Sequence, residues 1–283
     1  MKKHLFILCA MATLPFSANA NTEHSDHQVA DSVIKTQRLT LKENSKDKGF
    51  GPQAPRDIDQ ITGSNQRDFA IAPVYSKMNL CNIHFHENAE HKGGEFTQYA
   101  GNGNGHGYGS GYKYTGKLSA EELTPAEVGV SEHGSLVPGD TIEVHYVHST
   151  AKVKPGPTLA SCLSDSTSNP QLRVEAQVYV LVNDPKALNF IELTKIGEKD
   201  GYQQALNIPS NAGKAIEYIG STTGPTYNEK ASPYQVTWNV RPKVLKVDIN
   251  SVGKWLQSNT FNEDHAHGVR NLVTNPKLLS TIK

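Results

Sequence analysis

The sequence is rich in histidines, and three of them have a spacing that suits a metal site. The chain contains 12 histidines. His84 and His86 alternate along an apolar segment, so on a strand both imidazoles would face the same side. His145 lies in a second alternating segment. Three imidazoles converging from two strands leave a tetrahedral metal with one open position, as in catalytic zinc sites.

A polar residue precedes two of these histidines by two positions, and therefore shares a strand face with each of them. Asn82 stands in this relation to His84, and Glu143 to His145. A metal-bound histidine usually donates its second ring N–H to a carboxylate, a carbonyl oxygen or water, which fixes the tautomer. We therefore predict that Asn82 and Glu143 orient His84 and His145.

Segments around these residues resemble the metal-site segments of carbonic anhydrases, in the same order along the chain. They are Asn-Ile-His-Phe-His at 82–86, Ala-Glu-His at 89–91, Glu-Val-His-Tyr-Val-His at 143–148, Tyr-Ile-Gly-Ser-Thr-Thr-Gly-Pro at 218–225 and Val-Thr-Trp-Asn-Val at 236–240. The Glu-His pair follows the first histidines closely, and the threonine loop is one residue shorter than in the alpha class. These departures are similar to delta-class or delta-like carbonic anhydrases, whose site resembles the alpha-class site. The resemblance spans roughly residues 79–240.

The resemblance implies a zinc-dependent lyase that reversibly hydrates carbon dioxide to bicarbonate and a proton, with cobalt or cadmium as substitutes for zinc. It also implies that a threonine accepts a hydrogen bond from the attacking hydroxide and that a glutamate holds this threonine. Because the loop is one residue short, Thr222 and Thr223 both remain candidates. Glu90 is the expected glutamate, with Glu95 as the alternative.

The same resemblance implies that other residues support the site. His91 and Tyr218 would lie beneath the metal site and support it. Val147, Val178 and Trp238 would line the apolar wall against which carbon dioxide waits.

Each reaction cycle must release a proton to solvent, and a histidine near the mouth of the site is the natural carrier. His106, in a glycine-rich segment, is our candidate, and His133 and His148 are alternatives. His265 and His267 repeat the His-x-His spacing without a clear strand context. We predict that they form a surface or interface feature.

The elements that must position these residues are mostly strands. Alternation of apolar and polar residues predicts strands that are separated by Gly-, Pro-, Asn- and Asp-rich turns, namely 69–74, 80–86, 141–148, 172–182, 235–240 and 244–249. Helical signals are short, as at 251–258. The glycine-rich segment 99–114 predicts a surface loop. We therefore predict a mainly β (α+β) single domain around a large twisted antiparallel sheet with few short helices.

The first residues predict export. Lys2 and Lys3, an apolar run and the small residues before the cleavage position after Ala20 are typical of a signal peptide. We therefore divide the chain into a signal peptide at 1–20, a flexible polar leader at 21–55 and a catalytic domain at 56–283. The expected location is the periplasm or the exterior.

Export also bears on the cysteines and on the partners of the mature chain. After cleavage, Cys81 and Cys162 are the remaining cysteines, and an even pair in an oxidising compartment predicts a disulfide. The formal net charge is zero, so neither nucleic acid nor an anionic membrane is expected as a partner. A small-molecule substrate is expected, and the sequence does not indicate an oligomeric state.

Three alternatives use some of the same residues. A cupin would bind metal through His84, His86, Glu90 and His145, but leaves the threonine loop and Glu143 without a role. A copper–zinc superoxide dismutase needs further ligands, including a buried aspartate, that the sequence does not show. A non-catalytic periplasmic zinc-binding domain would keep the ligands and lose turnover.

Overall fold

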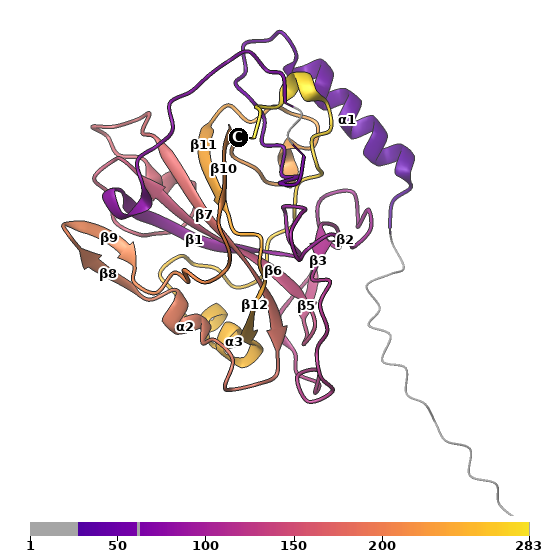
Figure 1. Cartoon of the computed structure of the whole chain (residues 1–283), viewed down its shortest axis with the longest axis vertical. Helices are drawn as coiled ribbons and strands as arrows, with labels where there is room; N and C mark the ends of the chain where they lie inside the picture. The colour runs from indigo at the N-terminus through magenta and orange to yellow at the C-terminus, as the bar shows by residue number, and fades with distance from the viewer. Residues whose placement is uncertain (1–27, 61–62, 283) are drawn as a thin grey trace, which may run out of the picture.

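A six-stranded sheet forms the centre of the molecule, which is described here by a computed structural model of residues 28–60 and 63–282. The strand order is β1–β6–β7–β11–β10, and β12 also pairs with β7 (Figure 1). The strands are β1 (Asn79–Glu87), β6 (Thr141–Ser149), β7 (Leu172–Val182), β10 (Ile216–Ser221), β11 (Gln235–Val240) and β12 (Leu245–Asp248). The predicted signal peptide lies outside the described residues.

The prediction of a mainly β single domain is confirmed, but the sheet is mixed and not antiparallel throughout. β1, β6 and β7 run antiparallel, whereas β11 and β12 both run parallel to β7. β11 pairs with the first part of β7 and β12 with the second, with Pro242 in the interruption between them. Alternation in a sequence shows which residues share a face, but it does not show strand direction.

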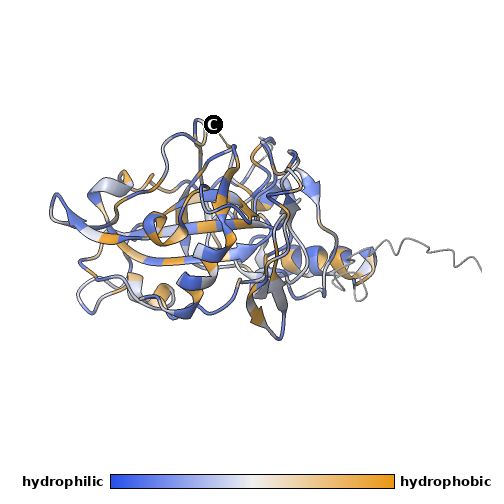
Figure 2. Cartoon of the chain, turned by 90° about the horizontal axis from the view of Figure 1, so that it is seen from below, coloured by the Kyte–Doolittle hydropathy of each residue, from blue (hydrophilic) through white to orange (hydrophobic). Residues whose placement is uncertain are grey.

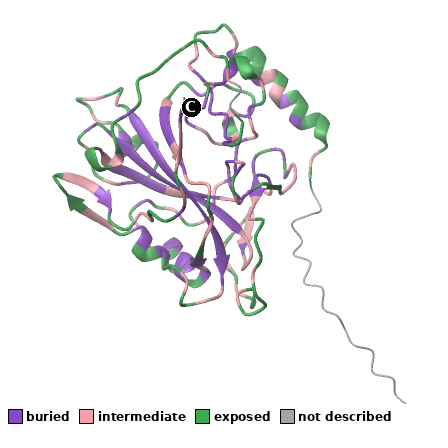
Figure 3. Cartoon of the chain, viewed as in Figure 1, coloured by how far each residue is buried: buried purple, intermediate pink, exposed green. Residues whose placement is uncertain are grey.

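Both faces of the sheet are covered, as the buried central strands of Figure 3 show. Every residue of β6 and β7 is buried. On one face, α2 (Phe190–Leu193) and α3 (Ile249–Gln257) pack against the sheet, with Phe85 and Trp255 in the shared core. α3 confirms the helical signal at 251–258.

The opposite face combines an apolar cluster with polar side chains and is covered mainly by loops. Val147, Val174, Tyr218 and Trp238 belong to this cluster. Figure 2 shows hydrophilic and hydrophobic residues interspersed along the strands. This face carries the predicted metal ligands.

The predicted flexible leader is wrong for α1 (Asp31–Ser45), a helix at the edge of the molecule next to the C-terminal segment in Figure 1. Ile34 and Leu41 on this helix are buried. Leu41 packs in a small cluster with the C-terminal residues Val273, Leu278 and Leu279. Tertiary contacts therefore order a segment whose polar composition suggested flexibility.

The glycine-rich segment is a packed loop between β2 (Gln98–Tyr99) and β3 (Tyr112–Lys113). Gln37 Nε2 of α1 donates to the Gly105 carbonyl at 2.7 Å, and the amide of Val269 donates to the Gly107 carbonyl at 2.9 Å. A Cβ at Gly107 would lie 2.6 Å from the Val269 carbonyl oxygen. Glycine is therefore required there for close approach.

The remaining pairs are peripheral, and one predicted strand is missing. Residues 69–74 form no strand. The short hairpins are β4 (Val128–Ser131) with β5 (Gly134–Leu136) and β8 (Ile196–Lys199) with β9 (Tyr202–Ala205). The predicted disulfide is confirmed, since Cys81 and Cys162 are joined with an S–S distance of 2.02 Å. Within the described part of the chain, no helix has the length and apolar character needed to cross a membrane.

Candidate active site

The register of two neighbouring strands brings the three predicted ligands together. His84 on β1 lies directly opposite His145 on β6, and His86 follows on the same face of β1. Their ring centroids are 5.1 Å apart for His84–His145, 5.3 Å for His84–His86 and 4.7 Å for His86–His145. One nitrogen of each ring lies within 4.8 Å of the other two. This separation suits simultaneous binding of one metal ion.

The partners of His84 and His145 decide which ring nitrogens remain free. His84 Nδ1 lies 2.6 Å from Asn82 Oδ1, and Asn82 Nδ2 donates to the Gly156 carbonyl at 3.1 Å, which fixes the amide orientation. His145 Nε2 lies 2.8 Å from Glu143 Oε1. Each of these nitrogens donates to its oxygen, so Nε2 of His84 and Nδ1 of His145 are free to bind a metal.

His86 has a partner that the sequence did not reveal. Its Nδ1 donates to the backbone carbonyl of Gly268 at 2.8 Å. Its Nε2 is buried and has no hydrogen-bond partner among the described residues. Burial lowers the pKa of His86 to about 4, and burial together with the neighbouring histidines lowers the pKa of His84. Both rings are therefore neutral at pH 7, which is the metal-binding form, and this donor set fits a zinc-type ion.

Glu143 is the centre of a buried network below the ligands. Besides His145, it accepts from His91 Nδ1 at 2.6 Å and from the His91 backbone amide at 2.9 Å. His91 Nε2 in turn lies 2.6 Å from the Tyr218 hydroxyl. Burial alone would raise the pKa of Glu143, but its interactions with His91 and His145 lower it well below the ordinary value. His91 and Tyr218 thus form a hydrogen-bonded chain below His145.

A second metal-compatible group consists of His91, Glu143 and His145. Its members already bind one another, because Glu143 Oε1 accepts from both imidazoles. The three histidines of the first group are therefore the better candidates for a metal site.

The structure separates the two threonines that the sequence left open. Thr223 Oγ1 donates to Glu90 Oε2 at 2.5 Å, whereas the Thr222 hydroxyl is bonded to the Ser232 hydroxyl. Glu95 accepts from a backbone amide that follows β11 and does not bind either threonine. The pair that matches the expected arrangement is therefore Thr223 with Glu90.

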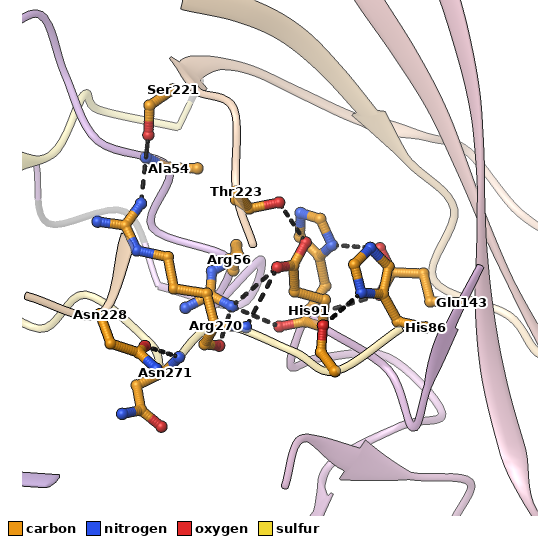
Figure 4. Close-up of polar contacts among 12 residues, drawn as sticks. Ala54, Arg56, His86, His91, Glu143, Ser221, Thr223, Asn228, Arg270 and Asn271 are labelled. Atoms are coloured by element: carbon orange, nitrogen blue, oxygen red, sulfur yellow. Dashed lines mark hydrogen bonds and ion pairs between the residues drawn. The ribbon is translucent and has the colours of Figure 1, made fainter. Parts of the chain in front are cut away.

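Glu90 is fully buried between charged groups, and Figure 4 shows Arg56 and Arg270 close to each other and to Thr223 in this region. Arg56 Nη1 lies 3.5 Å from Glu90 Oε1, and the Arg270 backbone amide donates to the same oxygen at 3.4 Å. Burial would raise the pKa of Glu90, but His86, Arg56 and His145 together lower it to about 2. Because Arg56 remains charged at neutral pH, Glu90 is a carboxylate that can only accept hydrogen bonds.

A cavity of about 240 Å³ opens above the three histidines. Val147, Val174 and Trp238 line it. The prediction for Val178 is wrong, because this residue does not line the cavity. It lies opposite Glu143 in the sheet, one level deeper than Val174, which lies opposite Val147.

The structure does not support the predicted proton carrier. His106 is exposed in its loop and does not line the cavity, nor does His133. His148 is buried, and burial lowers its pKa to about 3. His267 lines the cavity, with its ring centroid 5.4 Å from that of His84.

His267 is partly exposed, as a surface residue would be, and it also lines the cavity, which the prediction of a surface or interface feature did not include. Its backbone pairs with that of His86, which directs this C-terminal segment across the mouth of the site. The His-x-His spacing at 265–267 was the signal that could have identified it.

A family model described as delta carbonic anhydrase matches residues 75–251. The chain belongs to the delta carbonic anhydrase family. The resemblance seen in the sequence is thereby confirmed, and the chain is an enzyme of carbon dioxide and bicarbonate chemistry. Gly268 and Arg270, which contact the site of this carbonic anhydrase, lie beyond the matched region, and Arg56 lies before it.

Solved structures similar to this carbonic anhydrase include three other carbonic anhydrases. An alpha-carbonic anhydrase from Photobacterium profundum is 19% identical, with 80% of this chain and 88% of that chain covered and a TM-score of 0.27. A hyperthermostable enzyme from a hydrothermal vent chimney is 13% identical, with 85% and 90% covered and a TM-score of 0.27. The Thermovibrio ammonificans alpha enzyme, in complex with sulfanilamide, is 12% identical, with 84% and 88% covered and a TM-score of 0.26. No curated protein matches the sequence.

Proposed function

We propose that this enzyme binds zinc through His84, His86 and His145 and reversibly hydrates carbon dioxide to bicarbonate and a proton. The observation that carries the proposal is that the two nitrogens of each imidazole have different surroundings. One nitrogen of each imidazole is bound by a protein oxygen, and the other lies close to those of its two neighbours. Zinc bound there would lower the pKa of water to about 7 and supply hydroxide, an effect for which carbonic anhydrase is itself the standard example.

The protein's contribution begins with three oxygens that orient the ligands. The side chains of Asn82 and Glu143 and the carbonyl of Gly268 each hold one ring by its second nitrogen. These bonds fix the tautomers and leave the second nitrogen of each ring for the metal. An imidazole ligand carries no negative charge, so it would not cancel the positive charge of the metal.

Thr223 orients the nucleophile. Since Glu90 is ionised and only accepts, the hydroxyl hydrogen of Thr223 points to Glu90. The Thr223 oxygen is then an acceptor for the hydrogen of the attacking hydroxide, whose lone pair is directed toward the substrate. Val147 and Trp238 supply an apolar wall for carbon dioxide on the same cavity.

His267 is the proton carrier in this proposal, in place of His106. Its side chain is 44% exposed and also lines the cavity, so it contacts both the site and solvent. Its Nε2 bonds to Glu263, which holds the ring. His267→Ala should lower kcat about tenfold or more, with recovery in imidazole buffer, whereas His106→Ala should leave kcat unchanged.

The alternatives are weaker on this structure. A cupin site has no role for the Thr223–Glu90 bond or for Glu143, which holds His145. Membership of a carbonic anhydrase family counts against both the superoxide dismutase and the non-catalytic domain.

Stopped-flow hydration of carbon dioxide, combined with metal analysis of the same sample, tests the proposal. Activity should disappear on chelation and return with zinc, and cobalt and cadmium can be compared. His145→Ala should lose both metal and activity. Full zinc content in His145→Ala, or stoichiometric zinc without hydration in the wild type, would contradict the proposal.

We also propose that the chain is exported and cleaved after Ala20. The disulfide between Cys81 and Cys162 is consistent with an oxidising compartment. Intact-mass measurement of protein isolated from the periplasm tests this, since an uncleaved N-terminus would contradict it.

A further inference from the structure

Two buried arginines lie next to Glu90, and neither belongs to the region that matches the family model. Arg56 is 0% exposed and Arg270 is 2% exposed. A guanidinium cannot lose its proton inside a protein, so its burial is costly unless carboxylates and hydrogen bonds compensate it. The residues that compensate these two charges should therefore show why they are buried here.

Arg56 connects Glu90 to the C-terminal segment. Its Nη1 lies 3.5 Å from Glu90 Oε1 and 3.4 Å from the Glu90 carbonyl oxygen, and it also donates to the Arg270 carbonyl. The other donors, Nε and Nη2, have no hydrogen-bond partner among the described residues. The guanidinium thus contacts Glu90 and residue 270 through one nitrogen, while its other two nitrogens lack a hydrogen-bond partner among the described residues.

Arg270 contacts both sides of the Thr223–Glu90 pair. Its backbone amide donates to Glu90 Oε1 at 3.4 Å, while its side-chain Nη1 lies 3.4 Å from Ser221 Oγ. Ser221 ends β10, two residues before Thr223. The Arg270 Nη2 also donates to Gln53 Oε1 at 3.3 Å. Arg270 therefore contacts both the glutamate and the strand end that leads to the threonine; Figure 4 shows Arg270 with Ser221 and Thr223.

The two oxygens of Glu90 have separate partners as a result. Oε2 accepts from Thr223, and Oε1 faces Arg56 and the Arg270 amide. The buried charges also balance, since two carboxylates, Glu90 and Glu143, accompany two guanidiniums.

We propose that Arg56 and Arg270 are positioning residues that act through Glu90 and Ser221 to fix the hydroxyl of Thr223. This inference rests on the proposed role of Thr223 in orienting the nucleophile. None of the hydrogen bonds of either arginine reaches a ring of the three histidines. Their loss should therefore impair turnover without removing the metal.

A double-mutant cycle tests the inference. Arg56→Met and Arg270→Met are each made in the wild type and in Thr223→Ala, and kcat/KM for carbon dioxide hydration and zinc content are measured. In the wild type we expect a loss of about 10- to 100-fold, the range for residues that support a metal site. In Thr223→Ala we expect a further loss of at most about twofold, because the arginines act through this threonine. Zinc content should stay at one ion per chain.

Arg173→Met is the matched control. Arg173 is also a buried arginine, but it binds Glu175 and Glu217 away from the site. Its replacement should lower stability. Any effect on kcat/KM should be the same in the wild type as in Thr223→Ala. If the methionine variants do not fold, Arg56→Lys and Arg270→Lys replace them in the double-mutant cycle. Lysine keeps the positive charge but lacks the forked guanidinium donors.

A crystal structure of metal-free Arg270→Met gives a readout that does not depend on activity. The distance from Thr223 Oγ1 to Glu90 Oε2 should exceed about 3.5 Å, the limit of a hydrogen bond, whereas the bond from His145 to Glu143 should remain. A wild type without hydration activity refutes the proposed function itself. If the wild type is active, two results would overturn only this inference. One is an equal loss of kcat/KM on arginine replacement in the wild type and in Thr223→Ala, and the other is an intact Thr223–Glu90 bond in the arginine variant.

Discussion

Replacement of Thr223 by alanine is the most direct test of how the site orients its nucleophile. The change removes the hydroxyl that donates to Glu90 and leaves the three histidines with all their partners. We therefore expect Thr223→Ala to bind zinc normally and to lose most of its activity.

The size of the loss follows from the hydrogen bond. Thr223 Oγ1 lies 2.5 Å from a buried, ionised carboxylate oxygen. Hydrogen bonds to charged groups contribute about 1.5–3 kcal/mol. If this bond sets the alignment of the nucleophile, its removal raises the barrier by up to about 3 kcal/mol, which corresponds to roughly a 100-fold lower kcat/KM.

Thr222→Ala is the matched control one residue away. It breaks the bond between Thr222 and Ser232, both neutral hydroxyls, which contributes about 1 kcal/mol to stability. We expect a lower melting temperature and a kcat/KM within about threefold of the wild type in stopped-flow hydration. The reasoning is refuted if Thr222→Ala loses as much activity as Thr223→Ala, or if Thr223→Ala retains wild-type activity.

Further predictions concern stability and metal affinity. The Cys81→Ser/Cys162→Ser variant should lose about 4 kcal/mol of unfolding free energy in urea, because the disulfide spans a sequence separation of 81 residues; an unchanged midpoint would contradict this. Asn82→Leu should weaken zinc binding about 10- to 100-fold in chelator competition, since His84 loses its orienting oxygen. Burial lowers the pKa of His148 to about 3, so its contribution to stability is complete above the unfolded value of about 6.5 and is lost as pH falls toward 3. His148→Gln should therefore reduce the pH slope of stability by about 1.4 kcal/mol per pH unit between pH 6 and 4, and an equal slope would disprove it.

The grouping of the proposed ligands was predictable because it depends on local pattern. Alternation along β1 placed His84 and His86 on one face, and the same rule placed Asn82 and Glu143 beside His84 and His145. A residue two positions away on a strand is a neighbour in every β fold, so no tertiary information was needed.

The partners that reach the site from distant segments were not predictable in this way. His86 is oriented by the carbonyl of Gly268, and a backbone carbonyl has no residue identity to detect in a sequence. Arg56 and Arg270 meet Glu90 only because both chain segments cover the same face of the sheet. Pairing at such separations is fixed by packing, and a single sequence does not show it.

The helix α1 was also not predictable from the sequence, because its order depends on distant segments. Its composition is polar, and it buries a narrow set of residues such as Ile34 and Leu41. Short polar helices gain most of their stability from tertiary packing and not from propensity. The glycine-rich loop and the C-terminal cluster that pack on α1 are far from it in sequence, so composition alone favoured disorder.

These two kinds of contact divide the site into parts with different requirements. The nitrogens proposed to bind the metal come from the adjacent strands β1 and β6, and the carbonyl of Gly268, which orients His86, comes from a distant segment. The orientation of Thr223 instead depends on contacts between Glu90, Arg56 and Arg270, which require the segments before β1 and after α3 to be packed on the same face of the sheet. Metal binding and nucleophile alignment should therefore be separable by mutation, because disturbing the flanking segments affects the second before the first.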